Sequence, residues 1–87
     1  MGKHERTAKK IKRKPTAKDI KWAELKRYLK SLGFEELQGS GSRVKFVYLK
    51  NDGERRLVIL HRNHPSPDVG PKTIDSVRSV LQELQLL

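Results

Sequence analysis

The chain has 87 residues, no cysteine, and 20 basic residues against ten acidic ones, so its formal net charge is +10. This length allows one small domain and excludes large enzymes with a nucleotide-cofactor domain. Without cysteine there is no disulfide and no thiolate zinc site, which fits a reducing, cytoplasmic setting. No apolar run approaches the roughly 20 residues that a membrane-spanning helix needs. The excess of positive charge indicates an anionic partner.

Basic charge is concentrated at the start of the chain. Seven basic residues and one acidic residue, Glu5, lie within residues 1–14. Ile11 is the only branched aliphatic side chain there, so this segment cannot bury a core of its own. Pro15 cannot continue a helix from upstream. We therefore predict a flexible basic arm over residues 1–15, which binds phosphate or only aids solubility, and a folded domain over residues 16–87.

The predicted domain has one helix near each of its ends. The first is expected to begin between Asp19 and Trp22 and to end at Gly33, a residue type that commonly terminates helices. Its apolar face is Trp22, Leu25, Tyr28, Leu29 and Leu32. The last helix is expected to start near Thr73, whose hydroxyl can cap it. Its apolar face is Ile74, Val77, Leu81 and Leu84.

Three strands lie between these helices. We predict them over residues 34–37, 43–49 and 55–61, with a turn signal at Asn51-Asp52-Gly53. In the second strand, alternation places Arg43, Lys45 and Val47 on one face. In the third strand both faces are equally apolar, so the pattern leaves open which one is buried. Either way an apolar strip stays on the open face, which indicates a partner surface or ordinary exposure.

The order of elements predicts an α+β fold, with a three-stranded antiparallel sheet that carries both helices on one face. Four patches in the same order resemble the HicA family of bacterial toxins over about residues 18 to 85. They are Ile20-Lys21-Trp22 with Leu25, Leu29 and Leu32-Gly33-Phe34; residues 39–46; His61-Arg62-Asn63-His64-Pro65; and Pro71-Lys72-Thr73-Ile74 with residues 77–81. The resemblance implies a double-stranded-RNA-binding-like α-β-β-β-α fold. It also implies metal-independent cleavage of RNA, chiefly mRNA, and neutralisation by a HicB-type antitoxin.

Candidate catalytic residues follow from the chemistry of RNA cleavage and from one departure from the family. Many members carry a catalytic histidine just after the Gly-Ser loop, where this chain has Arg43. Cleavage by the 2′-hydroxyl needs a proton acceptor, a proton donor for the leaving oxygen and positive charge at the phosphate. We predict His64 as the general acid or base and His61 as its partner or orienter.

Candidate RNA-binding residues surround these histidines in the sequence. Arg43, Lys45 and Arg62 are expected to hold phosphate, because guanidinium and ammonium groups are the usual phosphate donors. Ser40 and Ser42 belong to the Gly39–Ser42 loop, which either brings backbone close to an RNA phosphate or is a plain connection. A metal site would need a third ligand beside the two histidines, and Asp68 is the nearest candidate. We predict no metal and no small-molecule cofactor.

Three classes of function remain open at this point. The leading hypothesis is an endoribonuclease toxin that cleaves mRNA by histidine acid–base catalysis. The alternative is a non-catalytic RNA-binding module, which Arg43 at the usual histidine position favours. The third is a protein-interaction module that uses the open face of the sheet. Intact or cleaved RNA separates the first two hypotheses, and RNA affinity at low salt separates both from the third.

Overall fold

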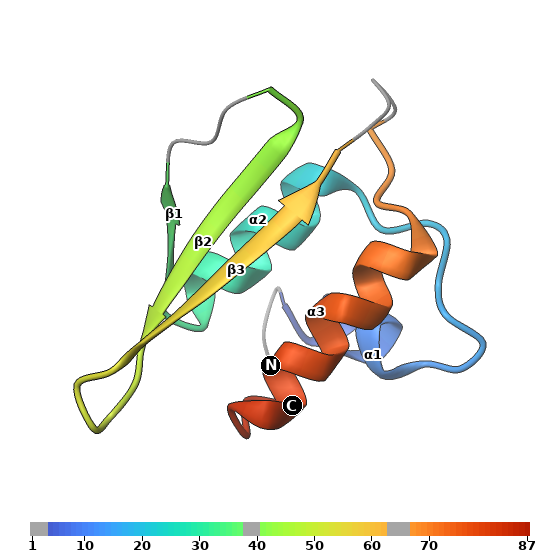
Figure 1. Cartoon of the computed structure of the whole chain (residues 1–87). Helices are drawn as coiled ribbons and strands as arrows, with labels where there is room; N and C mark the ends of the chain where they lie inside the picture. Colours follow the sequence, from blue (N-terminus) through green and yellow to red (C-terminus); the bar gives the residue numbers. More distant parts are fainter. Residues whose placement is uncertain (1–3, 38–40, 63–66) are drawn as a thin grey trace.

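The computed structural model describes residues 4–37, 41–62 and 67–87 (Figure 1). Its elements are α1 (Glu5–Lys12), α2 (Trp22–Ser31), β1 (Phe34–Leu37), β2 (Arg43–Leu49), β3 (Arg55–His61) and α3 (Pro71–Glu83). The predicted α+β fold is confirmed, and the three strands have the predicted bounds. One helix, α1, precedes the predicted elements, so the order is α-α-β-β-β-α.

The sheet has the order β1-β2-β3, and both neighbouring pairs are antiparallel. Helix α2 packs against β1 and α3 packs against β3, so both helices cover the same face, as predicted (Figure 1). Phe46 at the middle of β2 is fully buried and lies opposite Val58 of β3. The core therefore sits between this face of the sheet and the two helices.

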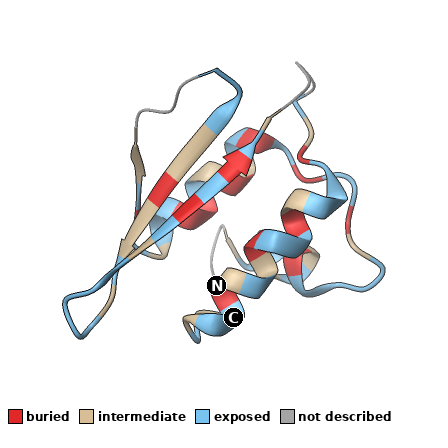
Figure 2. Cartoon of the chain, in the orientation of Figure 1, coloured by how far each residue is buried: buried red, intermediate tan, exposed pale blue. Residues whose placement is uncertain are grey.

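Burial along β3 settles the choice that its sequence leaves open. Val58 and Leu60 are 7% and 3% exposed, whereas Leu57 and Ile59 are 46% and 44% exposed. Figure 2 shows this alternation of buried and exposed positions along the strand. The face with Leu57, Ile59 and His61 is therefore the open one, because side chains alternate between the two faces of a strand.

Helix α1 replaces most of the predicted flexible arm. It packs against α2 and α3, and its Ile11 is 0% exposed. The Thr7 hydroxyl donates a hydrogen bond of 2.8 Å to the carboxylate of Glu24 on α2. The prediction of a flexible arm is wrong for residues 5–12, because one isoleucine suffices when it joins a core that other helices supply. Ala17 and Ile20, which follow α1, are also fully buried.

The two predicted helix ends have different outcomes. Gly33 follows α2 with a φ of +107°, so the predicted glycine stop is confirmed. Helix α3 begins at Pro71, two residues before Thr73, with Gly70 as its N-cap, so the prediction that Thr73 caps the helix is wrong. Proline at the first helical position has a suitable φ and no N–H that would lack a partner, so it extends the helix upstream of the threonine.

Candidate functional site

The open face of the sheet carries a mixed basic and apolar surface. In Figure 1, β3 passes in front of α2, so the viewer looks onto this face. Register and alternation place Arg43, Lys45, Val47 and Leu49 of β2 beside Arg55, Leu57, Ile59 and His61 of β3. The basic groups Arg43 and Lys45 lie at the His61 end, whereas Arg55 lies at the other end, beside the 50–54 turn.

Arg43 and His61 are direct cross-strand partners. The Arg62 N–H donates to the Ser42 carbonyl at 2.7 Å, just outside this pair, which makes it a non-hydrogen-bonded pair of the ladder. In such pairs the Cβ atoms lie only about 4.5–5.5 Å apart, on the same face. Both residues are exposed. The geometry therefore brings an imidazole and a guanidinium together on a surface that solvent reaches.

Lys45 continues this basic surface toward the middle of the sheet. It lies two positions along β2 from Arg43, on the same face, and it pairs with Ile59. The sequence leaves open which face of β3 is buried, and the register now places Arg43, Lys45 and His61 on one face. Lys45 therefore supplies a second cation two residues from Arg43 on the same face.

Arg62 follows β3 and lies over the ring of Trp22, with 5.6 Å between its guanidinium carbon and the ring centroid. Trp22 is buried at the start of α2, so it forms a fixed platform for this cation. The sequence pattern places Trp22 on the apolar face of its helix and predicts only a core role for it. Its position at the first turn of a helix was the available signal, because a core aromatic at a helix end can present its ring edge or face to a neighbouring loop.

The chain after residue 66 is anchored beside the same tryptophan. The Trp22 N–H donates to the Pro67 carbonyl at 2.8 Å, and the Val69 N–H donates to the Ile20 carbonyl at 2.7 Å. Lys21 binds Asp68 in an ion pair of 2.6 Å. Arg62 and Pro67, which flank residues 63–66, are therefore both held at Trp22. His64 itself lies outside the described residues, and so does Ser40.

The described part of the Gly-Ser loop leads directly into the site. Gly41 has a φ of +63°, and nothing within 4 Å would meet a Cβ there. Ser42 is exposed, and its carbonyl is the acceptor for the Arg62 N–H. The loop thus ends one residue from Arg43 and is tied by its backbone to the end of β3.

The sequence offers Asp68 as the third ligand of an imagined metal site. In the structure, the Asp68 carboxylate is bound to Lys21. Among residues 4–37, 41–62 and 67–87, no three His, Asp or Glu side chains lie close enough together to hold a metal ion. At the end of β3, the described residues therefore offer hydrogen-bond donors for phosphate and the imidazole of His61.

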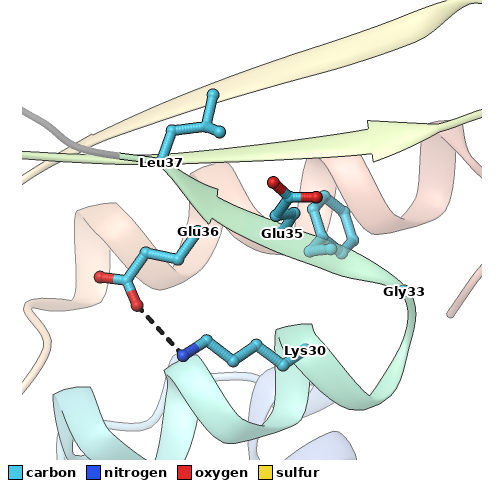
Figure 3. Close-up of a pocket in the computed structure, with 6 residues that line it drawn as sticks. Lys30, Gly33, Glu35, Glu36 and Leu37 are labelled. Atoms are coloured by element: carbon cyan, nitrogen blue, oxygen red, sulfur yellow. Dashed lines mark ion pairs between the residues drawn. The ribbon is translucent and has the colours of Figure 1, made fainter.

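A hollow between α2 and β1 lies apart from the predicted site residues. It has a volume of about 670 Å³ and is lined by Lys30, Gly33, Phe34, Glu35, Glu36 and Leu37. Figure 3 shows Glu36 pointing toward Lys30 of α2, while Leu37 points to the other side of β1. The Glu36 carboxylate lies 3.1 Å from the Lys26 ammonium and 3.3 Å from that of Lys30.

The charges at this hollow neutralise one another. Burial alone would raise the pKa of Glu36, but hydrogen bonds from Lys26 and Lys30 outweigh it and lower that pKa below its usual value. Both ammonium groups are thereby engaged by one carboxylate. The hollow fastens β1 to α2 and leaves little cationic charge for a ligand.

A comparison with known protein families matches residues 22–86 to the family described as HicA toxin of bacterial toxin-antitoxin. No curated protein and no solved structure gives a match. No helix among the described residues is both long and apolar enough to cross a membrane. The matched segment runs from α2 to just beyond α3, so it contains the sheet and the Arg43–His61 pair. The chain belongs to the HicA family of toxins from bacterial toxin–antitoxin systems, whose members are mRNA interferases.

Proposed function

We propose that this protein is a metal-independent endoribonuclease that cleaves mRNA at the His61 end of the open sheet face. The observation that carries the proposal is the Arg43–His61 pair. It places an exposed imidazole beside an exposed guanidinium on a surface that no helix of the described chain covers. Family membership supports RNA as the substrate, and the surrounding Lys45 and Arg62 suit its phosphates.

The proposed step uses the nucleophile that RNA itself contains. The ribose 2′-oxygen attacks the adjacent phosphorus as a base removes its proton, and the P–O5′ bond breaks as an acid protonates the leaving 5′-oxygen. The products are a 2′,3′-cyclic phosphate and a 5′-hydroxyl. His64 and His61 take these proton-transfer roles, with His64 as general acid or base and His61 as its partner or orienter. Arg43 and Lys45 stabilise the charge that gathers on the phosphate.

We further propose that a HicB-type antitoxin holds this activity in check in the cytoplasm. Membership of a toxin–antitoxin family implies an antitoxin partner. The apolar strip of Val47, Leu57 and Ile59 adjoins the basic site on the same face. An exposed apolar strip of this kind suits contact with another protein.

A second candidate function is a non-catalytic RNA-binding module. The observation that favours it is Arg43 at the position where many family members carry a catalytic histidine. In that case the same basic surface binds RNA through phosphate contacts and leaves the strand intact.

The deciding experiment compares two oligonucleotides of one sequence, RNA and fully 2′-O-methylated RNA, incubated with the antitoxin-free protein in EDTA. The proposal predicts cleavage of the RNA only, with cyclic phosphate ends, because methylation removes the nucleophile. Binding of both strands without cleavage by a protein verified as folded supports the module instead. Cleavage of the methylated strand contradicts the proposed step.

A further inference from the structure

Helix α1 lies outside the matched family segment and carries a row of exposed basic side chains. Arg6, Lys9, Lys12 and Arg13 are exposed and are hereafter called the α1 ridge. Arg6 and Lys9 are three residues apart on one side of the helix, and Arg13, its C-cap, follows Lys9 by four residues. Ile11 and Thr7 are buried on the opposite side. Among the described residues, Asp19 is the one acidic partner of the ridge, and it lies 3.8 Å from Arg13.

The α1 ridge is held in place by contacts along the helix and after it. The Arg78 guanidinium of α3 donates to the Ile11 carbonyl at 2.7 Å and to the Thr16 hydroxyl at 3.2 Å. Thr16 in turn donates to Asp75 of α3 at 2.6 Å. The basic side chains of α1 therefore project from a docked helix rather than from a loose tail. Fixed charges of this kind lose less entropy when they bind an anionic chain.

We propose that the α1 ridge is a second binding site for the sugar–phosphate backbone of single-stranded RNA. Of the described elements, α1 contacts α2 and α3 and touches no strand, so the ridge and the open sheet face lie on different sides of the molecule. An RNA bound at both sites passes around the edge of a body that measures 35 × 34 × 20 Å. The choice of RNA as ligand rests on the proposed function.

The exposed side of α1 fits RNA better than a membrane surface. A helix that lies in a lipid interface needs bulky apolar side chains on the face opposite its charges. The bulky apolar residue of α1 is Ile11, and it is 0% exposed within the protein. What α1 offers to solvent is charge, which binds phosphate by releasing counterions.

The test measures binding of 2′-O-methyl RNA, which cannot be cleaved by the proposed step, at a series of salt concentrations. Two lengths are used, ~4 and ~16 nucleotides, which span the usual range of single-strand sites. The ridge variant is Arg6→Gln with Lys9→Gln. The matched control is Lys50→Gln with Arg55→Gln, which removes the same charge at the turn end of the sheet, and circular dichroism verifies the fold of both.

For the longer RNA, the ridge variant should make the slope of log K against log salt shallower by about 1.4, because each lost phosphate contact contributes roughly 0.7. The control and the shorter RNA should show no such change. An equal change in ridge and control variants, or no change in either, overturns the proposal. The proposal is also overturned if the ridge variant binds RNA like the wild type and loses only its binding to anionic lipid vesicles. A shallower slope beside RNA that is never cleaved leaves the ridge standing and refutes only the endoribonuclease.

Discussion

Arg43 of β2 and His61 of β3 face each other directly across the sheet, on the side that α2 and α3 leave uncovered. Their pairing depends on the register of the β2–β3 hairpin. A slip of β3 by one residue would send His61 to the opposite face, into the apolar core, while Arg43 stayed on the open face. The buried Phe46–Val58 pair of the same hairpin opposes such a slip, because Val58 would become exposed. Core packing thus fixes the relative position of the two candidate site residues.

Arg43→Gln should lower the rate of RNA cleavage by about 10²- to 10³-fold, because it removes a donor aimed at the developing phosphate charge. Single-turnover cleavage measures this rate directly. Arg55→Gln removes the same charge from the same face at the other end of the sheet and serves as control. Equal loss in both variants would mean that only the overall charge of the face matters.

Ile11→Ala should destabilise the whole domain by about 2–5 kcal/mol, since the side chain is 0% exposed and its removal leaves a cavity. Lys12→Ala, an exposed neighbour on the same helix, should change the free energy of unfolding by less than about 0.5 kcal/mol. Urea unfolding measures both. An Ile11 variant as stable as the wild type would mean that α1 is not docked in solution.

Gly33→Ala should cost about 1–2 kcal/mol for its positive φ, plus a steric contribution. An added Cβ would lie 3.3 Å from Cε1 of Tyr48. Gly53 has a φ of +89° with nothing within 4 Å of an added Cβ, so Gly53→Ala isolates the backbone part. Thermal unfolding should therefore show the larger loss for Gly33→Ala. The reverse order would contradict the tight contact between the α2–β1 turn and β2.

Acid should destabilise the protein through two carboxylates on α3. The hydrogen bond from Thr16 lowers the pKa of Asp75 most, with help from Arg78, and the hydrogen bond from Arg56 lowers the pKa of Glu83. A depressed folded-state pKa contributes stability above the unfolded value of about 4, and this is lost as pH falls through the folded value. Glu83→Gln should therefore lower Tm at neutral pH and converge with the wild type in acid. A constant difference in Tm across that range would contradict the ion pair.

Much of the fold follows from local signals in the chain. The Asn51-Asp52-Gly53 turn and Gly33 delimit the strands, which is why the predicted strand bounds match the structure. Helix α1 is not predicted because the composition of residues 1–14, with one isoleucine, indicates no core. The burial of Ile11 depends instead on α2 and α3, which lie far along the chain. Thr73 resembles a capping residue, but Gly70 and Pro71 before it form the actual start of α3.

The candidate site was predictable in part. Alternation places Arg43 and Lys45 on one face, and the length of β3 ends that strand at His61. Which face of β3 stays open depends on packing against the helices, so the Arg43–His61 pair needed the register to be seen. The Arg62–Trp22 contact joins residues far apart in the chain, and the position of Trp22 at the first turn of a helix is a weak local signal for it.

The most direct test of acid–base catalysis at the end of β3 is the single-turnover cleavage rate of His61→Ala and His64→Ala. Each variant is compared with Arg55→Gln, and RNA binding is measured in parallel. Loss of a proton-transfer group should lower the rate by about 10²- to 10⁴-fold while binding changes little. The Arg55 variant should cleave within about twofold of the wild type, because its side chain lies at the other end of the face. Full activity in both histidine variants would contradict acid–base catalysis at the end of β3.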